Sequence, residues 1–237
     1  IEGCSWRRWT CWRLEPWSFF YFGLMLPVTV PVSDKMHGDA IARQLSVCLD
    51  TAPTGRDRPQ MRNGRDDDRL AAVLVPLIWR DSNWQILMTK RAAHLSHHAG
   101  QISFPGGALD ASDKGLIDTA LREAHEEISL APPSVEVMGS LLPVRSPAGY
   151  IVQPIVGIIG SDIFNELRPD PAEVDRIFTL PLAHIGQPDN FSLAPRQTNG
   201  LVDSYWVVSH PEHHIWGLSA RVLNDLRQRL YHGQTSA

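Results

Sequence analysis

The sequence predicts a mixed α/β sandwich that forms one globular domain, and three observations support this fold class. Apolar runs of strand length occupy residues 71–79, 84–91, 135–144 and 151–160. A strongly periodic helix is expected at residues 112–130, and strands on both sides of one amphipathic helix favour a sheet covered by helices. Finally, 43% hydrophobic and 20% charged residues in a chain of 237 are enough to bury a core, which excludes disordered, collagen-like and coiled-coil proteins.

The first 35 residues differ in composition from the rest of the chain. They hold four of the eight tryptophans, and residues 19–26 are almost all apolar. A basic start before an apolar run resembles a signal peptide, but Glu15 and Pro16 interrupt it and no small-residue cleavage site follows. The apolar run is also shorter than the ~20 residues of a membrane-spanning helix. We therefore expect no stable membrane span and interpret residues 1–35 as an atypical N-terminal extension, with a non-native or a disordered segment as the alternatives left open.

The next segments lead into the folded domain. Met36 opens a segment with helical amphipathicity, whereas residues 51–68 are rich in Pro, Gly and charged side chains, which is typical of a solvated connector. We expect an N-terminal helix and linker at residues 36–68, the folded domain at residues 69–232 and a tail at residues 233–237.

The first two apolar runs predict a β-hairpin. They are separated by Arg80–Asn83, whose sequence RDSN is typical of a turn. The runs at 135–144 and 151–160 predict later strands, and residues 220–230 predict a second helix.

Charge and cysteine content limit the class of ligand and the compartment. The chain carries 22 Lys and Arg against 26 Asp and Glu, a formal net charge of −4, which gives no overall electrostatic reason to bind nucleic acid. A phosphate-bearing ligand must then be bound by local groups. The three cysteines all lie near the N-terminus without metal-ligand spacing, which favours a reducing, cytoplasmic compartment.

The helix expected at residues 112–130 has two distinct faces. Its apolar residues recur at spacings of four, three and four and predict one buried stripe, formed by Ile117, Leu121, Ala124 and Ile128. Ser112 is the expected N-cap, because a serine hydroxyl can accept a hydrogen bond from the first helical turn. The opposite face is expected to meet solvent or a site.

Three glutamates occupy that opposite face. Glu126 and Glu127 follow Glu123 by three and four residues, so their Cβ atoms lie about 5–6 Å from that of Glu123. Like charges so placed repel, and a bound Mg²⁺ or Mn²⁺ would turn the repulsion into attraction, because hard cations prefer carboxylate oxygens. Arg122 is placed to form a charge-assisted hydrogen bond to a neighbouring carboxylate. The alternative is an acidic helix face that is merely solvated.

A glycine-containing loop precedes this helix. Pro105, Gly106 and Gly107 predict a tight turn with positive φ at both glycines, which would bring the loop close to the carboxylates. Each feature alone is common, but a loop and a carboxylate cluster at this spacing indicate a site.

Gly107, Asp113 and residues 122–130 together resemble the Nudix box, G-x5-E-x7-R-E-U-x-E-E-x-G-U. The chain departs from it in three ways: Asp113 replaces Glu, one extra residue separates it from Arg122, and Ser129 replaces Gly. The first two departures are typical of the coenzyme A pyrophosphatase branch of the Nudix hydrolase family.

The segment before the box also resembles that branch. Residues 87–92, Gly100 and residues 104–107 stand at the spacing of its motif, L-L-T-x-R-[SA]-x3-R-x3-G-x3-F-P-G-G, with Met88 at the second leucine and Ser96 where the motif has its second arginine. With similar segments further downstream, the resemblance spans roughly residues 36–230.

This resemblance implies an α+β protein with the Nudix-type α/β/α sandwich, a mixed sheet and a catalytic loop-helix-loop. It also implies a divalent-metal-dependent coenzyme A diphosphatase, which cleaves coenzyme A to 4′-phosphopantetheine and 3′,5′-ADP, with its thioesters as further candidates. Glu123, Glu126 and Glu127 would bind Mg²⁺ or Mn²⁺, and Arg122, Glu126 and Glu127 would be catalytic. Whether Glu126 completes the metal shell or acts as general base stays open.

Residues before the box, and the glycine that opens it, are the candidates for substrate binding. Lys90 and Arg91 end a predicted strand, where a cationic pair would suit phosphates, and Gly106 and Gly107 follow in the loop. For the histidine-rich loop, we favour substrate contact over zinc binding, since the carboxylates already account for a metal. The histidines of this loop are His94, His97 and His98.

Three further residues are weaker candidates for the base or for supporting contacts. They are Asp113, His125 and Glu173, the last of which lies in an expected loop, residues 169–178, that could close over the site.

Two other functions compete with this interpretation. The box specifies phosphate chemistry and not the attached group, so a Nudix pyrophosphatase for ADP-ribose, NADH or nucleoside triphosphates is the main alternative. The non-enzyme alternative is a regulatory domain that senses a ligand, but the presence of all three glutamates favours a hydrolase. In either case the expected partner is a small nucleotide and not a nucleic acid, and a homodimer is left open.

Overall fold

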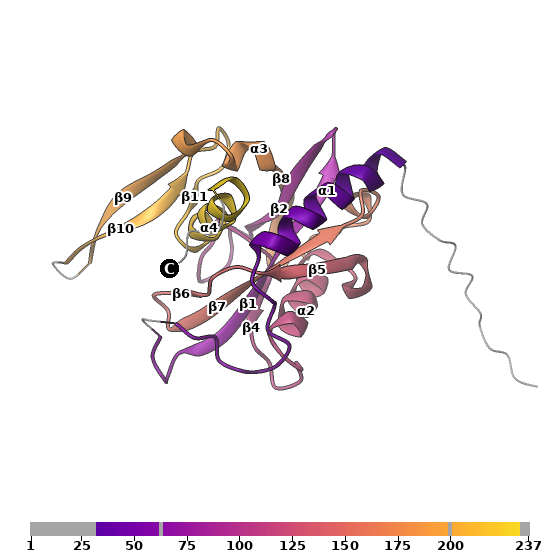
Figure 1. Ribbon diagram of the computed structural model, residues 1–237. Coiled ribbons are helices and arrows are strands. Elements are labelled where there is room, and N and C mark those ends of the chain that lie inside the picture. The colour runs from indigo at the N-terminus through magenta and orange to yellow at the C-terminus, as the bar shows by residue number, and fades with distance from the viewer. Residues whose placement is uncertain (1–31, 62–63, 199–200, 233–237) are drawn as a thin grey trace, which may run out of the picture.

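The chain folds into an α/β/α sandwich, as the sequence predicted (Figure 1). The computed structural model describes residues 32–61, 64–198 and 201–232. In these residues the helices are α1 (Val32–Cys48), α2 (Leu116–Ile128), α3 (Leu182–Ile185) and α4 (Leu218–His232), with 3₁₀ turns at Pro132–Ser134, Ile163–Asn165 and Pro188–Asn190. The strands are β1 (Arg69–Arg80), β2 (Asn83–Arg91), β3 (Ile102–Ser103), β4 (Gly106–Ala108), β5 (Val135–Ser140), β6 (Val144–Arg145), β7 (Tyr150–Ile159), β8 (Val174–Pro181), β9 (Phe191–Thr198), β10 (Leu201–Val208) and β11 (Ile215–Trp216).

These strands form two sheets. Among the described residues, eight strands make one sheet with the order β3-β2-β1-β7-β5, in which β4 also pairs with β1, β6 with β7 and β8 with β2. The sheet is mixed, because β1 and β7 run parallel while the other pairs are antiparallel. β9, β10 and β11 form a separate antiparallel sheet, whose long hairpin extends away from the main sheet in Figure 1.

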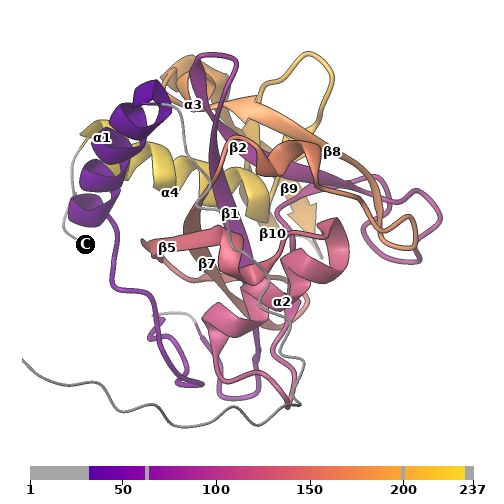
Figure 2. The same cartoon turned by 90° about the vertical axis from the view of Figure 1, so that its right-hand side faces the viewer.

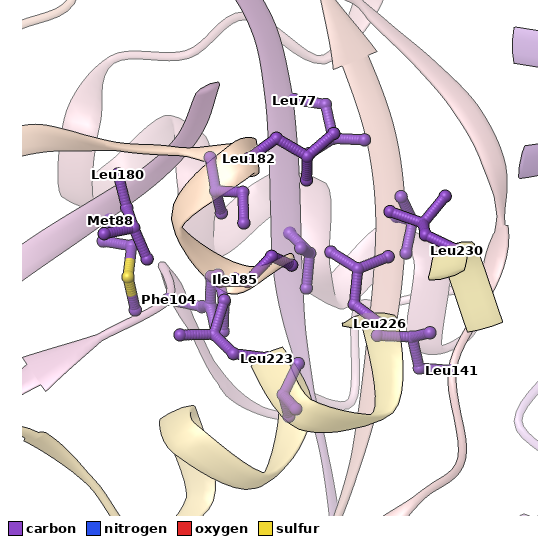
Figure 3. Packing of buried hydrophobic residues seen from close by; sticks show 14 of the residues in the cluster. Leu77, Met88, Phe104, Leu141, Leu180, Leu182, Ile185, Leu223, Leu226 and Leu230 are labelled. Carbon is purple, nitrogen blue, oxygen red and sulfur yellow. The ribbon is translucent and has the colours of Figure 1, made fainter. Parts of the chain in front are cut away.

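Alternate residues of β1 pack on opposite sides of the main sheet, as the period of a strand requires. Leu74 and Ile78 belong to the core beneath α2. Leu77 belongs to the second core, where Figure 3 shows it in one cluster with Leu182 of α3 and Leu226 of α4. α1 also packs into this second core, so α1 and α2 lie on opposite sides of β1, as Figure 2 shows.

The β1–β2 hairpin predicted at residues 80–83 is confirmed. Arg80 pairs with Asn83, which leaves Asp81 and Ser82 as a two-residue turn with φ angles of 53° and 60°. Positive φ at both central residues is the geometry that matches the right-handed twist of a hairpin, and Asp tolerates it better than most residues.

Helix α2 is shorter than predicted at its N-terminal end. It begins at Leu116 after Gly115, and Ser112 does not cap it, because both the backbone N–H and the hydroxyl of Ser112 donate to Asp110 Oδ1, at 2.8 and 2.7 Å. At the other end Ser129 adopts the left-handed conformation, with φ 58°, and its N–H donates to His125 O at 2.9 Å. Serine therefore forms the helix-ending turn for which glycine is usually required.

Several other element boundaries differ from the prediction. The segment at 135–144 is divided into β5 and β6, with a register shift in β5, and α1 begins at Val32 rather than Met36. The sheet formed by β9, β10 and β11 was not predicted. Most of the proposed extension, residues 1–31, and the tail 233–237 lie outside the described residues. None of the described helices combines the length and hydrophobicity that crossing a membrane requires.

Candidate active site

The segment at Gly106 and Gly107 is a strand and not the tight turn that the sequence predicted. Gly106–Ala108 pairs with β1, with Gly107 opposite Ala72 and Gly106 opposite Val73. A Cβ on Gly107 would lie 2.5 Å from the carboxyl group of Glu123, and one on Gly106 would lie 2.6 Å from Val73 Cα. The glycines are therefore needed for close approach of β4 to α2 and β1.

Arg122 lies at the centre of the carboxylate cluster. Its Nε and Nη2 donate to the two carboxylate oxygens of Asp113, at 2.8 and 3.0 Å. Its Nη1 lies 2.9 Å from an oxygen of Glu123 and 2.9 Å from an oxygen of Glu126. Nη2 also donates to the carbonyl of Ala108 in β4, at 3.2 Å. The predicted contact of Arg122 with a neighbouring carboxylate is confirmed, and it involves three carboxylates at once.

Asp113 supports Arg122 and is not a candidate base. It is buried and also accepts hydrogen bonds from the Asp110 N–H and the Thr119 hydroxyl, both at 2.9 Å. The bound Arg122 guanidinium lowers the pKa of Asp113 to about 2, against the opposing effect of burial. A carboxylate with this pKa and four hydrogen bonds is a poor proton acceptor near neutral pH. Of the roles predicted for Asp113, the structure supports that of positioning Arg122.

The connector at residues 51–68 is bound to the domain, although its composition suggested a solvated segment. Arg56 Nη1 donates to the carbonyls of Ala111 and Asp113, at 3.1 and 2.6 Å. A Cβ on Gly115 would also approach the backbone of Gly55 too closely. The linker thus holds the loop that carries Asp113, a contact between distant segments that no local pattern in the sequence records.

Glu127 is buried, which corrects the prediction that it lies on an exposed helix face. Only 3% of its side chain is accessible, and its Oε2 has no hydrogen-bond partner in the described structure. Its Oε1 lies 3.7 Å from Nη1 of Arg91, and the Gly106 N–H also hydrogen bonds to the carboxylate. Burial raises the pKa of Glu127 to about 8, with Arg91 opposing this and Glu173 and Glu123 adding to it.

Glu123 and Glu173 complete this acidic region. Glu123 is half-buried, and burial raises its pKa while Arg122 opposes the effect. Glu173 is exposed and raises the pKa of both Glu123 and Glu127, so it lies within electrostatic reach of both. The loop predicted at residues 169–178 is shorter than expected, because β8 begins at Val174. The part that carries Glu173 is fixed to the domain, since Ala92 N–H donates to Glu173 O and Asp170 N–H donates to Glu127 O, both at 2.8 Å.

These side chains fit a divalent cation. The described residues contain no preassembled group of three or more His, Cys, Asp or Glu placed to hold a metal ion. However, Glu127 presents an unpaired buried oxygen, and burial and mutual repulsion keep Glu123 and Glu127 in an environment that disfavours their charge. Bound positive charge would relieve both costs. Mg²⁺ commonly takes only one or two protein carboxylates together with substrate phosphates, so this donor set is sufficient.

Glu126 and His125 lie on the solvent side of α2. The Glu126 side chain is 57% exposed and its carboxylate contacts Arg122. His125 is exposed as well. Among the three predicted glutamates, Glu126 is therefore the one in open contact with water.

The structure does not keep Lys90 and Arg91 together as a cationic pair. Arg91 contacts Glu127, whereas Lys90 Nζ lies 3.2 Å from Asp175 Oδ2 and lines a separate pocket. The chain shifts register between these residues in its pairing with β8.

The histidine-rich loop follows this strand. His94 Nε2 is hydrogen bonded to Ala172 O at 3.1 Å, His98 Nδ1 is hydrogen bonded to Gln101 Oε1 at 2.9 Å, and His97 and Ser96 are exposed. His94 thus ties the loop to the segment before β8, whereas the His98 contact stays within the loop.

The chain is similar in sequence and in structure to known proteins. The NUDIX domain family matches residues 68–199. A protein described as an uncharacterized Nudix hydrolase NudL, from Salmonella paratyphi B, is 40% identical over 169 residues, which cover 71% of this chain and 86% of the relative. Among solved structures, the Caenorhabditis elegans Ap4A hydrolase is 17% identical with a TM-score of 0.41 and covers 48% of this chain and 80% of its own. Shewanella oneidensis NrtR is 19% identical with a TM-score of 0.43 and covers 68% of this chain and 61% of its own.

Proposed function

Since the chain belongs to the NUDIX family and is a hydrolase of pyrophosphate bonds, we propose that its substrate is coenzyme A or a coenzyme A thioester. The products would be 4′-phosphopantetheine, acylated when the substrate is a thioester, and 3′,5′-ADP. The reaction would require Mg²⁺ or Mn²⁺.

One observation supports coenzyme A, rather than another Nudix substrate, as the compound that is cleaved. The motif that resembles the coenzyme A branch supplies the residues that contact the carboxylates of α2. Arg91 lies against Glu127, the Gly106 N–H hydrogen bonds to the same carboxylate, and Gly107 lies against Glu123. The upstream motif and the Nudix box thus form one site, which supports reading them together.

The mechanism assigns different roles to the glutamates. Glu123 and Glu127 would hold the cation, which when bound neutralises pyrophosphate oxygens and lowers the pKa of the attacking water. Glu126 would accept the proton from that water, because its carboxylate is exposed and is held by Arg122. The water oxygen forms a bond to one phosphorus, the bridging P–O bond breaks, and the bridging oxygen leaves with the other phosphate. Arg122 keeps Glu126 and Glu123 in place, and Asp113 in turn fixes Arg122.

A substrate panel tests the proposal. The full chain would be assayed with Mn²⁺ and with Mg²⁺ on coenzyme A, dephospho-coenzyme A, ADP-ribose, NADH and ATP, with products identified by mass spectrometry. We expect the highest kcat/KM on coenzyme A or a thioester, and release of 3′,5′-ADP. A higher kcat/KM on ADP-ribose, NADH or ATP would contradict the assignment. The Glu123→Gln variant, purified in parallel, excludes a contaminating hydrolase.

A further inference from the structure

A second feature of the molecule lies beside the end of β2, outside the carboxylate cluster. It is a pocket of about 360 Å³, within the size range of ligand sites. Its lining comes from segments far apart in the sequence. Its charged and aromatic lining side chains are Lys90, Arg176, Glu212, His213, His214 and Trp216.

One wall of the pocket is cationic. Lys90 and Arg176 flank Asp175, with Nζ of Lys90 at 3.2 Å and Nε of Arg176 at 3.9 Å from Oδ2. Asp175 can engage only part of their donors, because the ammonium has three and the guanidinium five. Both side chains remain accessible, at 34% and 56%. Glu212 also lines the pocket, so a ligand there meets both signs of charge.

The same cations act on a third basic group. Burial lowers the pKa of His213, and Arg176 and Lys90 lower it further, whereas Glu212 opposes them. This means that Lys90, Arg176 and His213 share one electrostatic environment. All three line the pocket, so an anion bound there would be attracted by each of them and would favour the protonated imidazole.

Another wall of the pocket is formed by planar rings. His214 and Trp216 lie with ring centroids 6.2 Å apart and planes inclined by 31°. Trp216 also packs against Tyr205 in an edge-to-face arrangement, with 5.4 Å between the ring centroids. His213 is likewise packed on Phe178, at 3.9 Å between centroids. Rings held in this way suit a planar heterocycle, because any nucleobase can stack its flat face on an aromatic side chain.

The pocket adjoins the carboxylate site through the backbone of β2. Lys90 precedes Arg91, whose Nη1 lies 3.7 Å from Glu127. In β2, Leu87 packs under α2 whereas Met88 packs in the second core, and this alternation carries Arg91 and Lys90 to different sides. A ligand that reaches both regions would therefore have to pass around the end of β2, from the side of Arg91 to the side of Lys90.

We propose that this pocket binds the phosphorylated nucleoside end of the substrate, with a ribose phosphate monoester bound by the donors of Lys90 and Arg176 that Asp175 does not engage, and the base against Trp216. The assignment rests on the proposed function, since coenzyme A carries a 3′-phosphate that dephospho-coenzyme A, ADP-ribose and NADH lack. It makes Arg176 and Lys90 determinants of specificity and gives them no part in the cleavage step.

The kinetic test compares Arg176→Gln with wild type on coenzyme A and on dephospho-coenzyme A. A charge-assisted hydrogen bond to phosphate corresponds to about tenfold or more in affinity. We therefore expect kcat/KM on coenzyme A to fall about tenfold or more, mainly through KM, and the value on dephospho-coenzyme A to fall much less. Arg80→Gln is the matched control, because Arg80, at the far end of β1, also pairs with an aspartate adjacent to it in the chain, Asp81. An unchanged ratio in Arg176→Gln would overturn the proposal.

A binding measurement separates this proposal from the proposed function. Calorimetry without metal would compare 3′,5′-ADP with 5′-AMP on wild type, Arg176→Gln and Trp216→Leu. We expect tighter binding of 3′,5′-ADP, lost in Arg176→Gln, and weaker binding of both nucleotides in Trp216→Leu. This result without hydrolysis of coenzyme A would support the pocket and contradict the proposed function. Hydrolysis of coenzyme A with equal binding of both nucleotides would contradict the pocket alone.

Discussion

The carboxylate site under α2 and the pocket beside Trp216 are assembled in different ways. The first is made mainly from one stretch of chain, from Gly106 to Glu127, with Arg91 and Glu173 added. The second combines β2, the loop before β3, β8 and the segment leading into β11. A site built from one stretch leaves a spacing pattern in the sequence, whereas a pocket built from four segments leaves none. In our proposals, the first region would carry out the cleavage and the second would select the substrate.

The largest effect is expected from the glutamates that would hold the metal. Glu123→Gln and Glu127→Gln should each lower kcat about 100-fold or more, because cation chemistry contributes several kcal/mol to phosphoryl reactions. Thermal melting should show that both variants remain folded. Glu136→Gln, which changes an exposed glutamate on β5, is the control. Near-normal turnover in both site variants would mean that the acidic cluster is only solvated, and the contrast between the regions would be lost.

Asp113→Asn tests whether the carboxylate site depends on its support. The free energy of unfolding should fall by about 1.5–3 kcal/mol at pH 7, because a hydrogen-bonded charge is lost, and kcat should fall with it. In wild type the folded pKa of about 2 lies below the ordinary 3.8. The stabilisation is therefore present above pH 4 and lost as pH falls toward 2.

Urea unfolding at pH 7 and at pH 3 measures both consequences of Asp113→Asn. The variant should lose less stability than wild type between these two values. Ser112→Ala on the same loop is expected to change stability by under ~0.5 kcal/mol, since Ser112 caps no helix. Equal losses in Asp113→Asn and Ser112→Ala would contradict the supporting role of Asp113.

A smaller effect is expected from Glu127 in the metal-free protein. Its folded pKa of about 8 lies above the ordinary 4.5, so the neutral form is favoured in the fold. Its contribution to stability is complete below pH 4.5 and is lost as pH rises through 8. Melting in chelator from pH 6 to 9 should therefore show a decline that is weaker in Glu127→Gln. Mn²⁺ should raise the melting temperature of wild type at pH 8.5 more than that of the variant. Parallel curves for both proteins would disprove the raised pKa.

The smallest effect is expected from shortening the N-terminus. A chain that begins at Met36 should keep its melting temperature and kcat, because the buried side chains described in α1 begin at Ile41. Removal of residues up to 50 should destabilise the protein strongly, since Ile41, Leu45 and Leu49 belong to the second core. Loss of folding on truncation at Met36 would show that the preceding segment packs on the domain. A change in the ratio of kcat/KM on coenzyme A to kcat/KM on dephospho-coenzyme A would indicate that the segment before Met36 contacts the pocket.

The sequence could predict the parts of the fold that depend on neighbours in the chain. The β1–β2 hairpin followed from two apolar runs and a turn, and the grouping of Arg122, Glu123 and Glu126 followed from helical spacing. The burial of Glu127 could not be predicted from period alone. The face of α2 that packs on the sheet includes Leu116, Ala120 and Glu127, whereas Ile117 and Leu121 of the expected stripe are only half-buried.

Contacts between segments far apart in the chain could not be predicted from the sequence patterns. Arg56 holds the loop of Asp113, and Arg91 offsets the charge of Glu127. Neither arginine stands at a sequence spacing that predicts its partner. The same holds for Arg176 and Trp216, which line one pocket although they come from β8 and β11. The glycines of β4 show a third limit. Two adjacent glycines predict a turn, whereas in the structure they lie in a strand and allow close packing.

The parallel pairing of β1 with β7 has a consequence for how the protein folds. Ten residues of β1, from Arg69 to Ile78, pair with a strand that the ribosome supplies only after β2, α2 and β5. Until then one edge of an apolar strand has no partner. Long-range parallel pairing of this kind is slow, because loop-closure entropy must be overcome before the contacts form. We expect refolding to be limited by the β1–β7 step and its yield to fall with protein concentration, as exposed edges meet between molecules.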